Sequence, residues 1–156
     1  MSDILKETVW GTAVDKLNHL KEVADIVRIG GDDVELNNTT WTKLTGTFTN
    51  PTNNGMAVDG NKITCLHSGL HQIIGVSDVA ITEHSGGVIY YSLHINGVES
   101  GRITTHTFTS KNKYENIAIV GFVTLGTNDH IEIFAKSGEV SETISITSLI
   151  VTVQGV

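Results

Sequence analysis

The chain has 156 residues, enough for one domain with a short extension and a core that needs no disulfide support. It contains 16 Gly and one Pro, only 17% of its residues are charged, and Thr, Ile and Val are frequent, which is typical of a β-rich protein. The net charge of -7 argues against nucleic acid as a partner, because phosphate binding requires a basic surface.

A single cysteine, Cys65, excludes an internal disulfide, and its position in the run ITCL predicts a buried small side chain. The first residues, MSDILKETVW, contain acidic groups and no apolar run long enough for a signal peptide or a membrane span. We therefore expect a protein that is made and folded in a cytoplasm and does not insert into a membrane.

Residues 1–28 are predicted to form an N-terminal helix that ends before Gly30-Gly31. Its apolar positions are spaced alternately three and four apart, as in a coiled-coil seam. The seam consists of Trp10, Ala13, Leu17, Leu20, Ala24 and Val27. Self-association through this seam is one interpretation, and an amphipathic helix packed on its own domain is the other. Trp10 is wide for a coiled-coil core and could instead anchor the helix to another protein.

Residues 29–40 are rich in Gly, Asp and Asn and are interpreted as a linker. From Trp41 to the end, apolar residues alternate with polar ones in segments separated by turns, which predicts a domain of about eight strands over residues 41–156. The expected strands cover 41–49, two short segments around a tight turn at Asp59-Gly60, and then 70–81, 88–95, 98–108, 114–125, 130–136 and 142–156. Asn96-Gly97 predicts a two-residue hairpin, and a phase change in the last strand predicts a bulge near Thr147.

The strand around IAIVGFVTL is apolar on both faces. Ile119, Val123 and Leu125 share one face, and Val120 and Phe122 lie on the other. One face can cover the domain's own core, but the other needs a second cover, and a neighbouring copy of the chain would supply it. Val120 and Phe122 are therefore the predicted interface residues.

The run VGFVTLGTNDHIEI resembles the interface-strand motif of tumour-necrosis-factor-like and complement-globular-head jelly rolls. Gly121, Phe122, Val123 and Leu125 match in order, Asp129 and Ile131 match the following turn and strand, and Asn128 stands where the family usually has Gly. The segment VDGNKITCLHSGLHQIIG is similar to another part of the family pattern, and the resemblance covers residues 41–156. It implies an antiparallel jelly-roll β-sandwich and a homotrimer.

A short trimeric coiled coil before a trimeric jelly roll resembles the plan of phage fibres, head decorations and tail knobs. The resemblance implies a non-enzymatic virion protein, a homotrimeric head fibre or decoration that contacts the capsid or another virion protein through the N-terminal helix. The alternative is a tail-tip receptor-binding knob that recognises a host surface glycan or protein. Its expected ligand loops contain Glu83, His84, Ser110, Lys111 and Asn112.

No catalytic, cofactor or metal site is predicted. His67 and His71 lie four apart on a strand-like segment and are not expected to converge. His84, His94, His106 and His130 are expected at exposed positions, and the acidic residues Asp129, Glu132, Glu139 and Glu142 at loop edges. An aromatic group, Trp41, Tyr90, Tyr91 and Phe108, is expected in the core or an interface, with a sugar-binding platform as the alternative.

Overall fold

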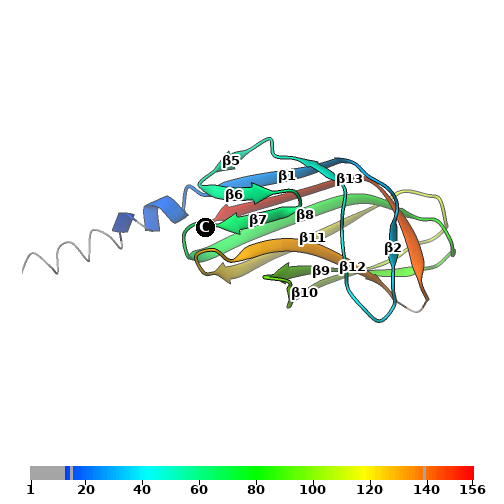
Figure 1. Ribbon diagram of the computed structural model, residues 1–156. Coiled ribbons are helices and arrows are strands. Elements are labelled where there is room, and N and C mark those ends of the chain that lie inside the picture. The colour runs from blue at the N-terminus through cyan, green and yellow to red at the C-terminus, as the bar shows by residue number, and fades with distance from the viewer. Residues whose placement is uncertain (1–12, 15, 139) are drawn as a thin grey trace, which may run out of the picture.

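The structure is a computed structural model that describes residues 13–14, 16–138 and 140–156. Two antiparallel sheets pack face to face, and a short helical segment lies at one end (Figure 1). The chain's C-terminus lies at the same end as this helix (Figure 1). We call this end the base and the opposite end the loop end.

The first sheet has the strand order β11-β8-β13-β1-β4, with β2 pairing with β13 and β5 with β1. Its strands are β1 (Val23–Gly30), β2 (Val34–Leu36), β4 (Thr47–Thr49), β5 (Asn53–Asn54), β8 (Gly69–Ile81), β11 (Glu115–Leu125) and β13 (Glu142–Gly155).

The second sheet has the order β10-β9-β12-β7-β6, and β3 pairs with β12. Its strands are β3 (Thr42–Lys43), β6 (Met56–Asp59), β7 (Lys62–Cys65), β9 (Val88–Ile95), β10 (Val98–Thr107) and β12 (His130–Ser137). Side chains from the facing sides of the two sheets form one buried apolar core, as alternation along the strands requires.

The predicted N-terminal helix is wrong over its last part. Residues 13–14 and 16–19 are helical, turns follow, and β1 begins at Val23. Ala24 of the predicted seam is fully buried in the domain's own core, and Val27 lies half-buried on the outer side of the same strand. Pairing with β13 explains the difference, because it buries Ala24 and Ile26 on one face of a strand. Trp10 lies outside the described residues.

Two further boundaries differ from the sequence prediction. The predicted linker contains β2 as well as the end of β1, so the sheet begins well before residue 41. The predicted first strand over 41–49 is divided between the two sheets, β3 pairing with β12 and β4 with β1. The tight turn between β6 and β7 is confirmed but lies one residue later, at Gly60-Asn61, because Asp59 pairs with Lys62.

The remaining strands agree closely with the sequence. The β9–β10 hairpin turns at Asn96-Gly97, whose φ angles of 53° and 77° are those that the predicted turn requires. In β13 the register against β8 shifts between Ile146 and Ser148, which confirms the bulge at Thr147. Among the described residues, no helix is long and apolar enough to cross a bilayer.

Candidate functional site

The outer face of the first sheet carries a row of apolar side chains across four strands. Val27 of β1 pairs with Ile150 of β13, Ile150 pairs with Val76 of β8, and Val76 pairs with Ala118 of β11. Directly paired residues of an antiparallel sheet point to the same side, so these four form one continuous stripe. Ile150 is exposed and the others are exposed or half-buried.

A second row lies beside the first. Ile74 of β8 pairs with Val120 of β11, and Phe122 follows two residues along β11 on the same side. Val120 is 58% exposed and Phe122 is 49% exposed, whereas Ile119 and Val123 are buried. The predicted orientation of this strand is confirmed, and self-association through Val120 and Phe122 remains a prediction. We call the two rows the apolar face.

The described part of the helix also exposes apolar side chains. Leu17 is 56% exposed, Leu20 is 54% exposed and Val14 is exposed as well. Ala13, another seam position, is exposed too. These side chains are therefore uncovered in a single chain, and contact between copies through Ala13, Leu17 and Leu20 remains a prediction.

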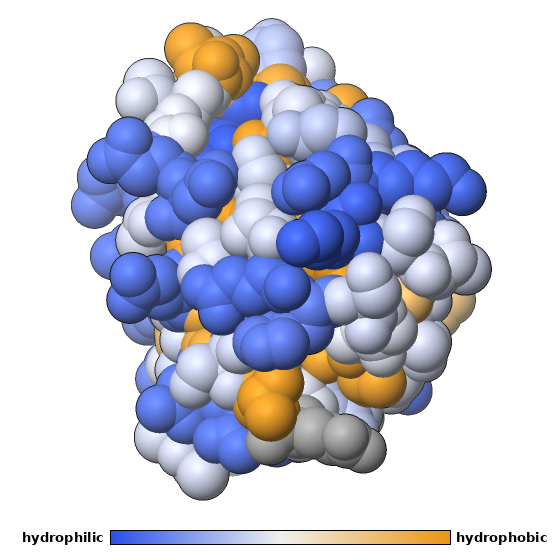
Figure 2. Space-filling view, turned by 90° about the vertical axis from the view of Figure 1, so that its right-hand side faces the viewer, coloured by the Kyte–Doolittle hydropathy of each residue, from blue (hydrophilic) through white to orange (hydrophobic). Residues whose placement is uncertain are grey.

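The two predicted ligand loops meet at the loop end. The Asn112 N–H donates to the carbonyl of Ile81 at 2.7 Å, and the Phe108 N–H donates to the carbonyl of Gly87 at 2.9 Å. Hydrophilic and neutral side chains cover most of this end (Figure 2). The expected ligand residues therefore come from two loops that lie side by side in the fold.

Glu142 holds the first of these loops in place. Its buried carboxylate accepts the N–H of Glu83 at 2.8 Å and the N–H of His84 at 3.2 Å, and it lies 3.2 Å from His84 Nδ1. A cavity of about 170 Å³ opens beside it, lined in part by Ser137 and Val140. Glu142 lies at a loop edge, as the sequence predicted, since it is the first residue of β13, but its carboxylate is buried and has a structural role.

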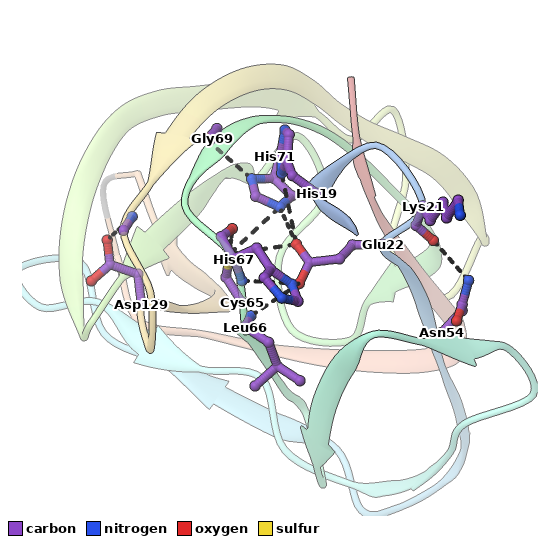
Figure 3. Close-up of polar contacts among 11 residues, drawn as sticks. His19, Lys21, Glu22, Asn54, Cys65, Leu66, His67, Gly69, His71 and Asp129 are labelled. Carbon is purple, nitrogen blue, oxygen red and sulfur yellow. Dashed lines mark hydrogen bonds and ion pairs between the residues drawn. The ribbon is translucent and has the colours of Figure 1, made fainter. Parts of the chain in front are cut away.

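A cluster of polar residues lies buried at the base, with the carboxylate of Glu22 at its centre (Figure 3). Glu22 Oε1 accepts the N–H groups of Leu66 at 3.3 Å and His67 at 3.0 Å, and lies 2.8 Å from His67 Nδ1. The connection from the helix to β1 supplies the carboxylate, and the segment between β7 and β8 supplies these partners. We call Glu22, His67, His19, Cys65 and His71 the basal cluster.

The other oxygen of Glu22 faces the remaining members. Oε2 lies 3.2 Å from His71 Nε2, 3.7 Å from His19 Nδ1 and 3.8 Å from Cys65 Sγ. Burial, together with the nearby Glu22 charge, raises the pKa of the Cys65 thiol to about 12. Burial also lowers the pKa of His71, because the charged imidazolium loses solvation.

The sequence prediction for these histidines was wrong. His67 and His71 converge on the two oxygens of one carboxylate, because the chain bends between β7 and β8. The sequence did contain a signal that His71 is buried. His71 occupies the inward phase of β8 with Ile73, and a polar group at such a position requires a buried partner. Cys65 is buried as predicted, although its neighbours are polar.

Two other expected surface residues are buried. His94 packs its ring against Phe134 with the centroids 3.9 Å apart, and Glu132 forms an ion pair with Lys43. His84 is exposed, as expected, whereas His106 and His130 are only partly exposed. Asp129 lies in the turn before β12, as expected, and Glu139 lies outside the described residues.

The aromatic group divides into two parts. Tyr91 and Phe108 are buried in the core, as expected. Trp41 and Tyr90 lie partly exposed on either side of Lys136, whose Nζ is 4.6 Å and 5.6 Å from their ring centroids. The four rings therefore do not form one platform.

Within the part of the chain that the structure describes, two groups of side chains have the composition and spacing to hold a metal ion. His19, Glu22 and His71 present ligand atoms within 4.8 Å of one another, and so do Glu83, His84 and Glu142. The first group is buried, whereas Glu83 and His84 of the second are exposed.

Comparisons with known proteins identify the fold. No protein-family model matches the sequence, and a comparison with curated protein sequences finds no similar one. The globular domain of zebrafish complement 1qA protein superposes with a TM-score of 0.55 and 12% identity, over 86% of this chain and 96% of that chain. Murine APRIL at pH 5.0 superposes with a TM-score of 0.53 and 11% identity, over 85% of this chain and 99% of that chain. The chain therefore has the tumour-necrosis-factor-like and complement-globular-head jelly-roll fold that its sequence predicted.

Proposed function

We propose that the protein is a non-enzymatic, self-assembling display module, a homotrimer whose subunits pack through the apolar face. The observation that carries the proposal is the apolar row across β1, β13, β8 and β11, with the second row beside it on β8 and β11; together they include Ile150, Ile74 and Val120. A contiguous exposed apolar face of this kind marks an interaction surface. The face lies on the outer side of the first sheet and reaches its edge strand β11, and packing of three such faces around a symmetry axis would cover it.

The arrangement of the two ends supports a display role. The helix and its exposed Leu17 and Leu20 lie at the base, and the polar loops lie at the opposite end (Figure 1). A base that binds a larger particle would direct the loops outward. We infer that the protein is a phage head fibre or capsid decoration, anchored by its N-terminal helix to the capsid or another virion protein.

Light scattering after size exclusion tests the assembly. The full chain should have the mass of three copies, and Phe122→Asp should shift it to one copy, because a charge would enter a dry contact. Val98→Asp is the matched control, since Val98 is exposed on β10 of the other sheet. A monomeric wild-type chain, or a trimer that survives Phe122→Asp, would contradict the proposed interface.

Binding to capsids tests the anchoring role. Purified capsids that lack this protein should bind the trimer at micromolar concentration, and Leu17→Asp with Leu20→Asp should abolish binding. Ile103→Asp, on the exposed side of β10, is the control that should still bind. Absence of binding by the wild-type trimer would exclude the decoration role and leave the assembly result unaffected.

A receptor-binding knob is the second candidate, favoured by the contact between the two predicted ligand loops. Lys111 and Asn112 lie beside the loop that contains Glu83 and His84, and a trimer would present this group three times. Labelled trimer should then adsorb to host cells, and Lys111→Glu should reduce adsorption more than Lys62→Glu on β7. A trimer that binds capsids but does not adsorb to cells would favour the decoration role.

A further inference from the structure

We propose that the basal cluster binds one Zn²⁺ ion per chain through His19, Glu22 and His71, with Cys65 as the fourth ligand. The assembly proposed above does not use this cluster, so the two proposals can fail independently. The donor set combines imidazole nitrogens, a carboxylate oxygen and a sulfur, all of which are common ligands of Zn²⁺.

The carboxylate of Glu22 has one oxygen turned to the protein and the other turned to the proposed ion. Oε1 is held by the N–H groups of Leu66 and His67 and lies 2.8 Å from His67 Nδ1. Partners of this kind orient a metal-binding carboxylate in known metal sites. Oε2 then faces His19, His71 and Cys65.

The ring of His71 is oriented in the same manner. Its Nδ1 lies 3.2 Å from the carbonyl of Gly69, which can only accept, so Nδ1 carries the proton. In the neutral ring Nε2 then presents a lone pair, and it faces Glu22 Oε2 at 3.2 Å. Two acceptors at this distance require a proton or a metal ion between them. A backbone carbonyl on the far nitrogen is a common partner of a metal-binding histidine.

The surroundings of His19 indicate that a metal ion, and not a proton, lies between His71 Nε2 and Glu22 Oε2. Its ring is buried, and neither Nδ1 nor Nε2 has a hydrogen-bond partner among the described residues. A proton shared by His71 and Glu22 would leave both of these nitrogens unsatisfied, at a cost in stability. A metal ion would use the Nδ1 lone pair. The ring is fitted closely against β8, since a Cβ at Gly69 would lie 2.5 Å from His19 Nε2.

The spacing of the ligand atoms fits a tetrahedral ion. Ligands about 2.0–2.3 Å from Zn²⁺ in a tetrahedron lie about 3.3–3.6 Å from one another. The observed distances are 3.2 Å from His71 Nε2 to Glu22 Oε2, 3.5 Å from His71 Nε2 to Cys65 Sγ and 3.7 Å from His19 Nδ1 to Glu22 Oε2. These three distances lie within a few tenths of an ångström of tetrahedral spacing. Cys65 must move further, because only His19, Glu22 and His71 lie within 4.8 Å of one another, and its thiol would give up its contact with the carbonyl of His67 at 2.7 Å.

The ion would join the end of the helix to the second sheet. His19 and Glu22 flank the turn between the helix and β1, and Cys65 is the last residue of β7. A cavity of about 310 Å³ lies against the ring of His19 and is also lined by Leu20 and Gly69. Binding would fix the direction in which the helix leaves the sandwich, which is where the proposed anchor begins.

The test uses the full chain without an affinity tag, stripped of metal by dialysis against a chelator. Titration with Zn²⁺ should show one ion bound per chain, and the melting temperature should rise on binding. Co²⁺ should give the visible spectrum of a tetrahedral complex with a thiolate-to-metal band in the near ultraviolet. His19→Gln should weaken Zn²⁺ binding by more than about 100-fold, because even partners outside the ligand shell typically contribute 10–100-fold.

His84→Gln is the matched control, because His84 belongs to the other group with metal-binding spacing, and it should bind Zn²⁺ like the wild type. The His19 variant should fold, since it removes no hydrogen bond of the His19 ring among the described residues. Circular dichroism of both variants checks this. Failure of the wild-type chain to bind Zn²⁺ at micromolar concentration, an octahedral Co²⁺ spectrum, or unchanged binding by His19→Gln would overturn the proposal.

Discussion

At the scale of single residues, several buried polar groups of this sandwich are stabilised by partners distant in sequence. Arg28 is buried, and its guanidinium donates to the carbonyls of Thr45, Ile146 and Asp32. Gly31 makes room for it, since a Cβ there would lie 2.7 Å from Arg28 Nη2. A buried cation is tolerated when carbonyl groups replace its water.

Cys65 should be unreactive in the folded, metal-free protein. Its thiol is buried and its pKa is raised to about 12, so almost no thiolate is present at neutral pH. A chromogenic disulfide reagent should modify it only at the rate of unfolding. Addition of denaturant should raise the rate to that of an exposed thiol. Rapid modification under native conditions would show that the base opens readily.

Glu115 should make stability depend on pH in the acid range. Hydrogen bonds from Thr109 and then His106 lower its pKa from 4.5 to about 2. A carboxylate with a lowered pKa stabilises the fold fully above its unfolded pKa, and this contribution is lost as the pH falls from about 4.5 to about 2. Glu115→Gln should therefore be less stable than wild type at pH 7 and nearly equal near pH 2.

Urea denaturation at both pH values measures this difference. Glu35→Gln, an exposed position on β2, is the control and should show little difference from wild type at either pH. A gap between Glu115→Gln and wild type that persists near pH 2 would contradict the role assigned to the carboxylate.

At the scale of elements, the sequence predicted strands well where long apolar or alternating segments were bounded by turns. β9 and β13 were found because apolar and polar residues alternate along them, and β11 because it is a continuous apolar run between turns. β1 was missed because its inward phase contains Ala24, Ile26 and Arg28, and the small and charged members conceal the pattern. The spacing of Ala24 and Val27 then extended the helical seam into the strand.

A buried charge in β1 should show that the strand belongs to the core. Ala24→Asp should lower the free energy of unfolding by more than about 3 kcal/mol, because an unpaired carboxylate would enter a fully buried site. Ile29→Asp is the control on the same strand, at an exposed position, and should change stability by less than about 0.5 kcal/mol. Chemical denaturation measures both. Equal effects would place Ala24 outside the core.

The basal cluster shows what one sequence cannot supply. The sequence analysis gave His19 and Glu22 no role beyond lying within the predicted helix, and it placed Cys65 and His71 in a separate strand region. Only the packing of the helix end against the β7–β8 connection brings them together. Residue types and inward phase could have marked Cys65 and His71 as buried polar groups in need of partners. Their partners could not be identified without the topology.

At the scale of the whole molecule, the proposed trimer would link folding to assembly through the apolar face. If three chains bury this face against one another, the folded state is favoured by mass action, and stability depends on protein concentration. The melting temperature of the wild-type chain should rise as its concentration is increased. The melting temperature of Phe122→Asp should stay constant over the same range. A wild-type melting temperature independent of concentration would contradict an assembly coupled to folding.

The position of β1 has a mechanical consequence. β1 follows the helix directly and pairs with β13 over six residues, from Val23 opposite Gln154 to Arg28 opposite Leu149, while β4 and β5 pair with its other edge. Tension between an anchored helix and the loop end would pull β1 along its own length, so its hydrogen bonds on both edges would bear the load together. A force perpendicular to β1 would instead break these hydrogen bonds one at a time. The strand order thus makes the base of the sandwich resistant to shear along β1, the direction in which a load on the proposed anchor would act.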